Sequence, residues 1–215
     1  MRVRRIVDLS RLVSADTQVY PGDPAPVLTP HATLSDDGYN LLRIDMGSQT
    51  GTHVDAPRHM RAAGEPVDRL APDLFVGRGV VVDVRGLAAG APITADLLGG
   101  AECGPGDIVL LHTGWDAHYG TDEYFAHPYL AADACRELLG RGVRTIGIDA
   151  PSLDATGASE FPAHWLIADA GGVICENLCG LGRIDFPDPL ISILPIRLRD
   201  GDGAPVRAVA MQIRP

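Results

Sequence analysis

Short apolar runs separated by helical stretches constrain the fold of this chain more than any other feature. They are rich in β-branched residues and lie in the middle of the sequence, at Val80–Val84, Ile108–Leu111, Thr145–Ile148 and Val173–Cys175. Runs of this kind, without polar alternation, are typical of strands that are covered on both faces of a parallel sheet. Parallel neighbours also need a crossover connection, which is usually a helix. The middle of the chain is therefore predicted to form βαβ units.

The helices expected between these strands have recognisable ends. Leu130–Leu139 is rich in alanine and leucine and stops at Gly140, and glycine is frequent just after the last helical residue. Pro162 suits the first turn of a helix that runs to about Ala170, because this turn does not need the N–H that proline lacks. Both helices would lie between predicted strands, where a crossover is needed.

Further strands are expected nearer the ends of the chain. Leu41–Met46 alternates apolar and polar residues and predicts a half-buried strand. The other strand-like runs are Val3–Leu9, Leu190–Leu198 and Val206–Ile213. We therefore predict an α/β fold with crossovers in its middle and antiparallel pieces at its ends, in a single compact mixed-sheet domain over residues 1–215.

Charge and hydropathy limit the partners and the location of this chain. The net charge is −10, and no basic stripe is present that would neutralise phosphates, which argues against nucleic acid and against an anionic membrane surface. No apolar run is long enough to span a bilayer, and the residues after Met1 become polar by Asp8, unlike a signal peptide. We therefore expect a cytoplasmic location, where the four cysteines would be free thiols.

The densest cluster of polar side chains is Gln49-Thr50-Gly51-Thr52-His53-Val54-Asp55-Ala56-Pro57-Arg58-His59. In extended backbone, residues two apart point the same way, so His53 and Asp55 can converge on one ion. Pro57 biases the backbone so that His59 can turn back towards the same point. Imidazole and carboxylate together are ligands for zinc, manganese or iron. The alternative from the spacing alone is a surface loop that contains two histidines.

A second candidate pair lies later in the chain. Glu176 follows the apolar run Val173–Cys175, and an ionised carboxylate there is costly unless it is paired or bound to a metal. His164 lies twelve residues earlier, in the first turn of the helix that begins at Pro162. A helix and the strand that follows it can bring both side chains to one end of the sheet. Alternatively, His164 is a partly exposed helical histidine and Glu176 a strand-end residue that faces water.

The cluster resembles the signature of the cyclase family of metal-dependent hydrolases, His-x-Gly-Thr-His-x-Asp-x-Pro-x-His, a family that includes bacterial kynurenine formamidases and isatin hydrolases. The resemblance covers nearly the whole chain. His164 and Glu176 match the spacing of the family's second ligand pair. The other similar segments are Val7-Asp8-Leu9-Ser10, Thr17-Gln18-Val19-Tyr20-Pro21-Gly22-Asp23, Gly147-Ile148-Asp149-Ala150-Pro151-Ser152-Leu153-Asp154 and Ala204-Pro205-Val206-Arg207-Ala208-Val209.

The resemblance implies a metal site built from four of these side chains. His53 and Asp55 would bind a first ion. Asp55 and Glu176 would bridge it to a second ion, and His164 would complete the second position. The implied cofactor is a divalent metal, zinc or manganese, with one or two ions per chain. The implied fold is α/β of the swivelling β/α/β type, usually assembled as a homodimer or a higher homo-oligomer.

The resemblance also implies a catalytic residue and a substrate contact, and it has one clear departure. His59 would be the general acid/base beside the metals, and Tyr20 would lie against a small-molecule substrate where the formamidases have tryptophan. The family's first histidine ligand is replaced by Gln49. An amide oxygen is a weaker and harder ligand than imidazole. We therefore predict one tightly bound ion and a second that is loosely bound or absent.

The function that the resemblance implies is hydrolysis of a C–N bond. It favours an arylformamidase that converts N-formyl-L-kynurenine to L-kynurenine and formate in tryptophan degradation. No Gly-x-Ser-x-Gly elbow occurs, which argues against a serine hydrolase. Two alternatives remain. The first is a related hydrolase of another amide, a lactam such as isatin, or a lactone. The second is a non-catalytic protein that binds a metal or a small molecule, with Gln49 marking decay of the site.

Overall fold

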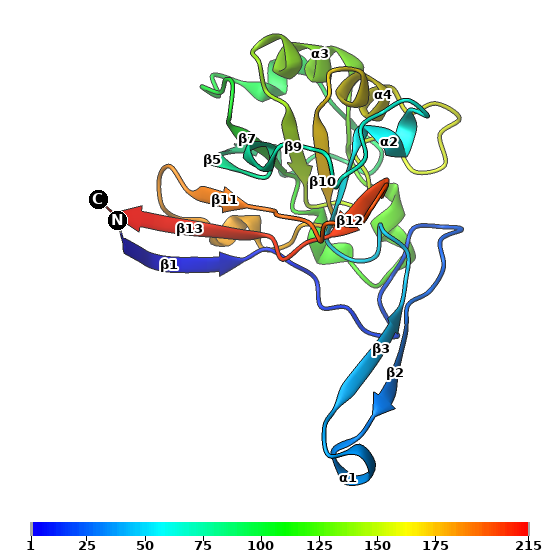
Figure 1. Cartoon of the computed structure of the whole chain (residues 1–215). Helices are drawn as coiled ribbons and strands as arrows, with labels where there is room; N and C mark the ends of the chain where they lie inside the picture. The colour runs from blue at the N-terminus through cyan, green and yellow to red at the C-terminus, as the bar shows by residue number, and fades with distance from the viewer. Residues whose placement is uncertain (1, 215) are drawn as a thin grey trace.

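A mixed sheet of nine strands forms the centre of the protein, whose computed structural model describes residues 2–214 (Figure 1). The middle strands are mutually parallel and are β5 (Val76–Asp83), β7 (Ile108–His112), β9 (Thr145–Ile148) and β10 (Val173–Glu176). The flanking strands all pair antiparallel and are β1 (Arg2–Asp8), β13 (Val209–Arg214), β11 (Leu190–Ser192), β4 (His53–Asp55) and β12 (Gly203–Pro205). The predicted α/β class and mixed sheet are therefore confirmed.

The middle strands lack polar alternation because both of their faces are covered. In β7, Val109 and Leu111 belong to one apolar core, whereas Ile108 and Leu110 belong to another. All four side chains are at most 1% exposed. Successive side chains of a strand point to opposite faces, so the two cores lie on opposite sides of the sheet.

Helices α3 (Ala132–Gly140) and α4 (Pro162–Asp169) form the predicted crossovers and lie together over one face of the sheet (Figure 1). Leu138 of α3 and Ile167 of α4 are buried in the apolar core that contains Val109 and Leu111. A short helix, α2 (Pro57–Met60), contacts α4. The remaining elements in this part of the chain are η1 (Pro72–Leu74), η2 (Ala95–Leu98), η3 (Trp115–His118), η4 (Asp122–Ala126), η5 (Leu181–Arg183), β6 (Pro92–Ile93) and β8 (Tyr129–Leu130).

An arm over residues 27–45 projects from the rest of the chain (Figure 1). It consists of the antiparallel strands β2 (Val27–Ala32) and β3 (Leu41–Asp45), with helix α1 (Leu34–Asp37) at its tip. The prediction that Leu41–Met46 is half buried is wrong, because every residue of β3 is exposed. β3 pairs only with β2, and within residues 2–214 nothing covers the arm's two faces.

One predicted strand is shorter than expected. The run Leu190–Leu198 forms a strand only as far as Ser192. Pro195 has no N–H to donate to a strand ladder, and it makes only an isolated bridge to Val206. The chain therefore leaves the sheet before it returns through β12.

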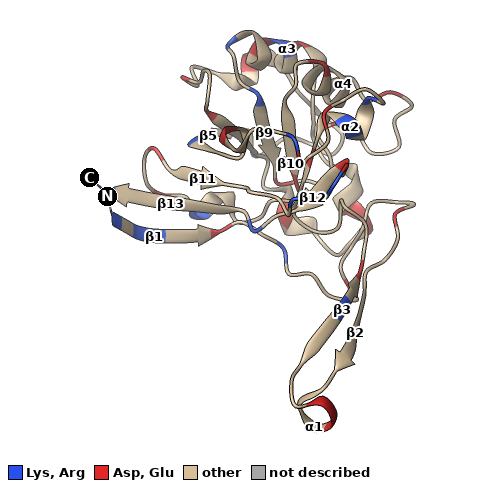
Figure 2. Cartoon of the chain, in the orientation of Figure 1, with Lys and Arg blue, Asp and Glu red and all other residues tan. Residues whose placement is uncertain are grey.

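Charged residues of opposite sign lie at distant parts of the surface. Figure 2 shows arginines on β1, near the two termini, and acidic residues in α1 at the tip of the arm. None of the helices within residues 2–214 has the length and apolar character needed to cross a membrane.

Candidate functional site

Two neighbouring strands bring three of the predicted site residues to one face of the sheet. His53 and Asp55 are two residues apart on β4, so their side chains point the same way. Glu176 on the antiparallel strand β10 lies directly opposite His53. All three side chains are buried. The strand pairing alone therefore places one imidazole and two carboxylates together.

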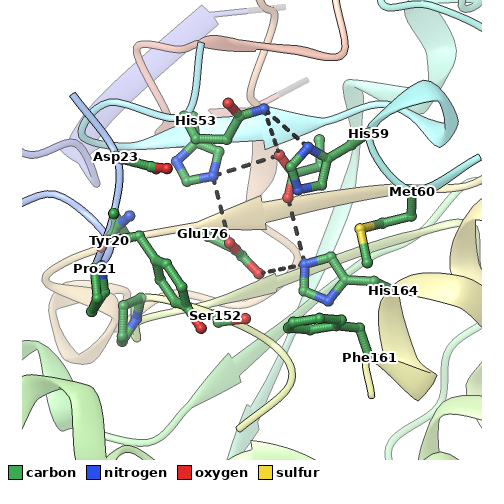
Figure 3. Close-up of a pocket in the computed structure, with 15 residues that line it drawn as sticks. Tyr20, Pro21, Asp23, His53, His59, Met60, Ser152, Phe161, His164 and Glu176 are labelled. Carbon is green, nitrogen blue, oxygen red and sulfur yellow. Dashed lines mark hydrogen bonds and ion pairs between the residues drawn. The ribbon is translucent and has the colours of Figure 1, made fainter. Parts of the chain in front are cut away.

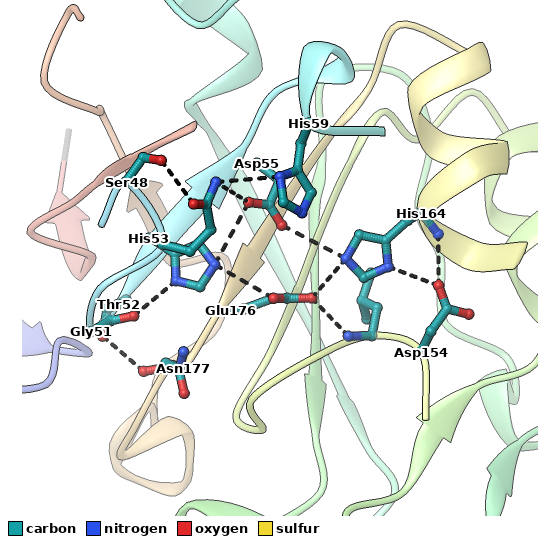
Figure 4. Close-up of polar contacts among 12 residues, drawn as sticks. Ser48, Gly51, Thr52, His53, Asp55, His59, Asp154, His164, Glu176 and Asn177 are labelled. Carbon is teal, nitrogen blue, oxygen red and sulfur yellow. Dashed lines mark hydrogen bonds and ion pairs between the residues drawn. The ribbon is translucent and has the colours of Figure 1, made fainter. Parts of the chain in front are cut away.

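Helix α4 adds His164 to this group. Pro162 begins the helix, which places His164 in its first turn, facing the end of β10. His164 Nε2 lies 3.3 Å from Glu176 Oε1 and 3.7 Å from Asp55 Oδ2. His53 Nε2 lies 3.5 Å from Glu176 Oε2 and 3.6 Å from Asp55 Oδ1. These side chains form a ring in which imidazole and carboxylate alternate (Figure 4); we call it the four-residue ring.

The spacing within the four-residue ring matches that of ligands around one cation. Its N···O distances are 3.3–3.7 Å. Two tetrahedral ligands at about 2.1 Å from one ion lie about 3.4 Å apart. Within residues 2–214, His53 Nε2 and Asp55 Oδ2 are buried without a hydrogen-bond partner. Since burying such atoms unpaired is costly, a bound cation would satisfy both.

Both imidazoles of the four-residue ring use Nδ1 for a hydrogen bond outside it and direct Nε2 towards the carboxylates. The Nδ1–H of His53 donates to the carbonyl oxygen of Gly51 at 2.8 Å, and the Nδ1–H of His164 donates to the Asp154 carboxylate at 2.7 Å. A neutral ring with its proton on Nδ1 presents a lone pair at Nε2. Lone pairs that face two carboxylates repel them unless a proton or a cation lies between. The residues present therefore fit a divalent metal ion.

The electrostatics of the ring favour positive charge at its centre. Burial opposes the charged form of His53, but the carboxylates of Asp55 and Glu176 raise the pKa of His53 to about 9. Burial likewise opposes charge on His164, yet its pKa is raised well above the usual range by the hydrogen bond to Asp154 and by the nearby carboxylates of Asp55 and Glu176. Burial would raise the pKa of Glu176, but its contacts with the two histidines lower it. A metal ion or protons can supply this charge.

His59 lies at the edge of the ring, nearer to solvent. Its side chain is 31% exposed, and Nδ1 lies 3.4 Å from Asp202 Oδ2. Two overlapping groups of side chains could each hold an ion, one of His53, Asp55 and Glu176 and the other of Asp55, His59 and His164. The geometry thus allows His59 to serve either as a ligand or as a proton carrier.

Gln49 turns its amide nitrogen, and not its oxygen, towards the carboxylates. Gln49 Nε2 lies 3.0 Å from Asp202 Oδ2 and 3.4 Å from Asp55 Oδ1. Gln49 Oε1 accepts a hydrogen bond from the Ser48 hydroxyl at 2.8 Å. An amide nitrogen is a donor without a lone pair for a metal. In this orientation Gln49 contributes hydrogen bonds to the site.

An open pocket of about 440 Å³ lies over the four-residue ring (Figure 3). This volume is in the range of small-molecule sites. Tyr20, Met60 and Phe161 contribute its larger apolar surfaces, and Ser152 and Asn177 contribute polar groups. Tyr20, predicted as a substrate contact, therefore lines the same cavity as the ring.

The sequence profile of the family described as "Putative cyclase" matches residues 7–155. The chain belongs to the cyclase family. The kynurenine formamidase of Salinibacter ruber is 35% identical over 209 residues, which cover 95% of this chain and 96% of that protein. The kynurenine formamidase of Bacillus cereus is 32% identical over 217 residues, which cover all of both chains.

Solved structures show the same fold for this cyclase-family chain. Isatin hydrolase A from Labrenzia aggregata, bound to benzyl benzoate, has a TM-score of 0.89 at 24% identity and covers 98% of this chain and 94% of its own. A potential metal-dependent hydrolase with cyclase activity has a TM-score of 0.80 at 27% identity, and the match covers 98% of this chain and 99% of that protein. These matches confirm that the chain has the α/β fold that the resemblance to the cyclase family implies.

Two buried or half-buried aspartates of this cyclase-family site were not predicted as site residues. Asp154 accepts the backbone N–H groups of Ala163 and His164, both at 3.0 Å, besides the His164 imidazole. It lies in a segment that resembles the family, but its role depends on the position of α4. Asp202 reaches His59 and Gln49 from a turn about 150 residues away in sequence. No sequence pattern indicates this contact.

Replacing Asp154 with asparagine is expected to lower metal affinity by about 10–100-fold, the usual effect of losing the group that orients a ligating histidine. The carboxylate fixes the His164 ring through Nδ1 and holds the start of α4. The measurement is competition between the protein and a chelator of known affinity. Asp169→Asn, an exposed aspartate at the other end of α4 that pairs with Arg61, is the control. Equal affinity in both variants would show that Asp154 does not support the metal site.

Proposed function

We propose that this chain is a metal-dependent hydrolase of amide C–N bonds and that its substrate is N-formyl-L-kynurenine, which it converts to L-kynurenine and formate. The observation that carries the proposal is the four-residue ring at the base of an open pocket, where two imidazoles and two carboxylates face one another at 3.3–3.7 Å. The two kynurenine formamidase relatives, 35% and 32% identical over nearly the full chain, support the choice of substrate.

The metal would be held by the four-residue ring. His53, Asp55 and Glu176 would hold one ion, and Asp55, Glu176 and His164 would hold the other where two are present. Imidazole and carboxylate ligands suit zinc or manganese. A bound divalent cation lowers the pKa of water from 15.7 to about 7 and polarises a carbonyl oxygen, which is the chemistry that hydrolysis of an amide requires.

The pocket walls would orient the substrate. Tyr20, Met60 and Phe161 offer apolar surface that suits an aryl ring, while Ser152 and Asn177 offer hydrogen-bonding groups nearer the strand ends. Figure 3 shows Tyr20 and Phe161 on different sides of the ring residues. A substrate held between these walls would present its formyl carbon to the base of the pocket.

His59 would carry the proton that hydrolysis moves. Water adds to the formyl carbon and loses a proton, the C–N bond breaks, and the arylamine nitrogen leaves with a proton gained. His59 can accept the first proton and donate the second, because imidazole titrates near neutral pH. Its side chain is partly exposed and lines the pocket, so it can exchange protons with a molecule bound there.

A substrate panel tests the proposed function. Metal-loaded protein should hydrolyse N-formyl-L-kynurenine with a kcat/KM at least about tenfold above that for isatin or simple lactones, since a fitted pocket discriminates by about 10–200-fold per small group. Release of kynurenine is followed by its absorbance, and the other products by chromatography. Faster opening of isatin would instead assign a lactam hydrolase, and turnover of none of these compounds would favour a non-catalytic binding protein.

A homodimer or higher assembly and a cytoplasmic location stay predictions. The assembly is supported by the exposed apolar side chains of the arm, among them Leu42 and Ile44, which a second copy could cover. Its test is the molar mass in solution by light scattering.

A further inference from the structure

The carboxylate of Asp202, which is not a member of the four-residue ring, contacts both His59 and Gln49. Its Oδ2 atom lies 3.4 Å from His59 Nδ1 and 3.0 Å from Gln49 Nε2. Its Oδ1 atom accepts from the Ser48 hydroxyl at 2.9 Å. Asp202 thus connects the residue that we assign to proton transfer with the position where the family has its first histidine.

The backbone holds Asp202 firmly in this place. Its carbonyl oxygen accepts the Ala56 N–H at 2.9 Å, at the junction of β4 and α2. The next residue, Gly203, pairs with Asp55 across the strand ladder. A Cβ added at Gly203 would lie 2.4 Å from the Val54 carbonyl oxygen and 2.9 Å from Gln49 Nε2. Only glycine therefore allows β12 and the Gln49 amide to approach this closely.

Charge decides which way the Gln49 amide faces. Its Nε2 atom lies 3.0 Å from Asp202 Oδ2 and 3.4 Å from both Asp55 Oδ1 and His59 Nδ1, and its two hydrogens suit the two carboxylates because these can only accept. The reversed amide would place its oxygen against both negative charges. Gln49 therefore bridges Asp55 and Asp202 as a donor. Imidazole cannot donate two hydrogens from one nitrogen in this way.

We propose that Gln49 and Asp202 are positioning residues for His59. Asp202 accepts the Nδ1–H of His59 and so leaves Nε2 free to face the pocket, and Gln49 keeps the Asp202 carboxylate oriented for this bond. The proposal rests on the proposed function in one respect, that His59 moves a proton. It assigns position 49 of this chain to hydrogen bonding, and not to metal ligation.

The kinetic test uses zinc-loaded protein and a series of N-formylanilines whose amine products differ in basicity. Asp202→Asn and Gln49→Leu should each lower kcat by about 10²-fold, the effect of a small misplacement of a catalytic group, with KM and zinc content near wild type. The loss should be largest for the most basic leaving amines, because these need the proton most. Asp200→Asn is the matched control, since Asp200 lies in the same turn but pairs with exposed Arg69. An equal loss for all anilines, or loss of zinc from Gln49→Leu, would overturn the proposal.

A second measurement does not depend on activity. The ¹⁵N shifts of the His59 ring in zinc-loaded protein, assigned by the loss of its signals in His59→Asn, report which nitrogen carries the proton. We expect the Nδ1–H form in the unmodified protein and a mixture of forms in Asp202→Asn. The same Nδ1–H form in both proteins would overturn the positioning role. If neither the formylanilines nor N-formyl-L-kynurenine is hydrolysed, the proposed function fails, and the ¹⁵N shifts of the His59 imidazole alone then decide whether Asp202 orients His59.

Discussion

Removal of the bound metal should abolish hydrolysis of N-formyl-L-kynurenine by this cyclase-family chain. Without a cation, His53 Nε2 and Asp55 Oδ2 are buried with no hydrogen-bond partner within residues 2–214. A proton shared between these side chains, unlike a metal ion, would not polarise the carbonyl oxygen of the substrate. Metal ions contribute several kcal/mol of transition-state stabilisation, so the rate should fall by at least about 10³-fold. The measurement is the initial rate after dialysis against a strong chelator, with metal content determined by elemental analysis.

Restoring the metal provides the control for this prediction. Zinc or manganese should restore the rate, because both accept imidazole as well as carboxylate ligands. Magnesium should restore it poorly, since it prefers an octahedral shell of oxygen ligands and two of the four ring residues are histidines. Undiminished turnover by protein shown to be free of metal would refute the metal requirement.

Replacing His59 with alanine should lower kcat by about 10²–10⁴-fold, the usual contribution of general acid–base catalysis. The metal content should stay near wild type, because the four-residue ring keeps all its members. His59 is the partly exposed histidine beside the pocket, and its imidazole can exchange protons with the substrate and with solvent. Steady-state rates and elemental analysis of the same preparations measure both quantities.

His31→Ala is the matched control for His59→Ala. His31 is an exposed histidine on β2 in the arm and does not line the pocket. This variant should keep both its kcat and its metal. If His59→Ala instead loses metal while the rate per bound ion is unchanged, His59 is a ligand of the second candidate group and not the proton carrier.

The sheet could be predicted because its signal is local. In β7 the four residues Ile108–Leu111 are all apolar, since each face of the strand enters its own core. Burial on both faces therefore appears directly in the sequence, as does the crossover helix that begins at Pro162. The exposure of β3 could not be predicted in this way. Its alternating pattern is that of a half-buried strand, but the arm places it away from both cores.

Some site residues could likewise be predicted from local sequence spacing, whereas others depend on the three-dimensional arrangement of the chain. His53 and Asp55 share a strand face because they are two apart, which spacing alone predicts. Their closeness to His164 and Glu176 followed from the resemblance, and the structure places these side chains within 3.3–3.7 Å of the carboxylates and imidazoles concerned. The contacts of Asp202 with His59 and Gln49 could not be predicted, because they depend on the pairing of β12 with β4.

The orientation of Gln49 could also not be predicted from the sequence. A glutamine at a ligand position suggests an amide oxygen directed at the metal. The structure instead directs the amide nitrogen towards Asp55 and Asp202, because two negative charges surround it. This orientation depends on a residue that is distant in sequence, so only the three-dimensional arrangement reveals it.

The most direct test of the central claim is the rate of kynurenine release while metal-free protein is titrated with zinc or manganese. If the four-residue ring holds the ion that hydrolysis needs, release of kynurenine and formate from N-formyl-L-kynurenine should begin near zero. The rate should then rise in proportion to bound metal and level off when the ring is filled. Glu176→Gln, which removes one carboxylate from the ring, should shift this rise to much higher metal concentration. Turnover by the metal-free protein at the rate of the loaded protein, or no turnover when the ring is filled, would contradict the account.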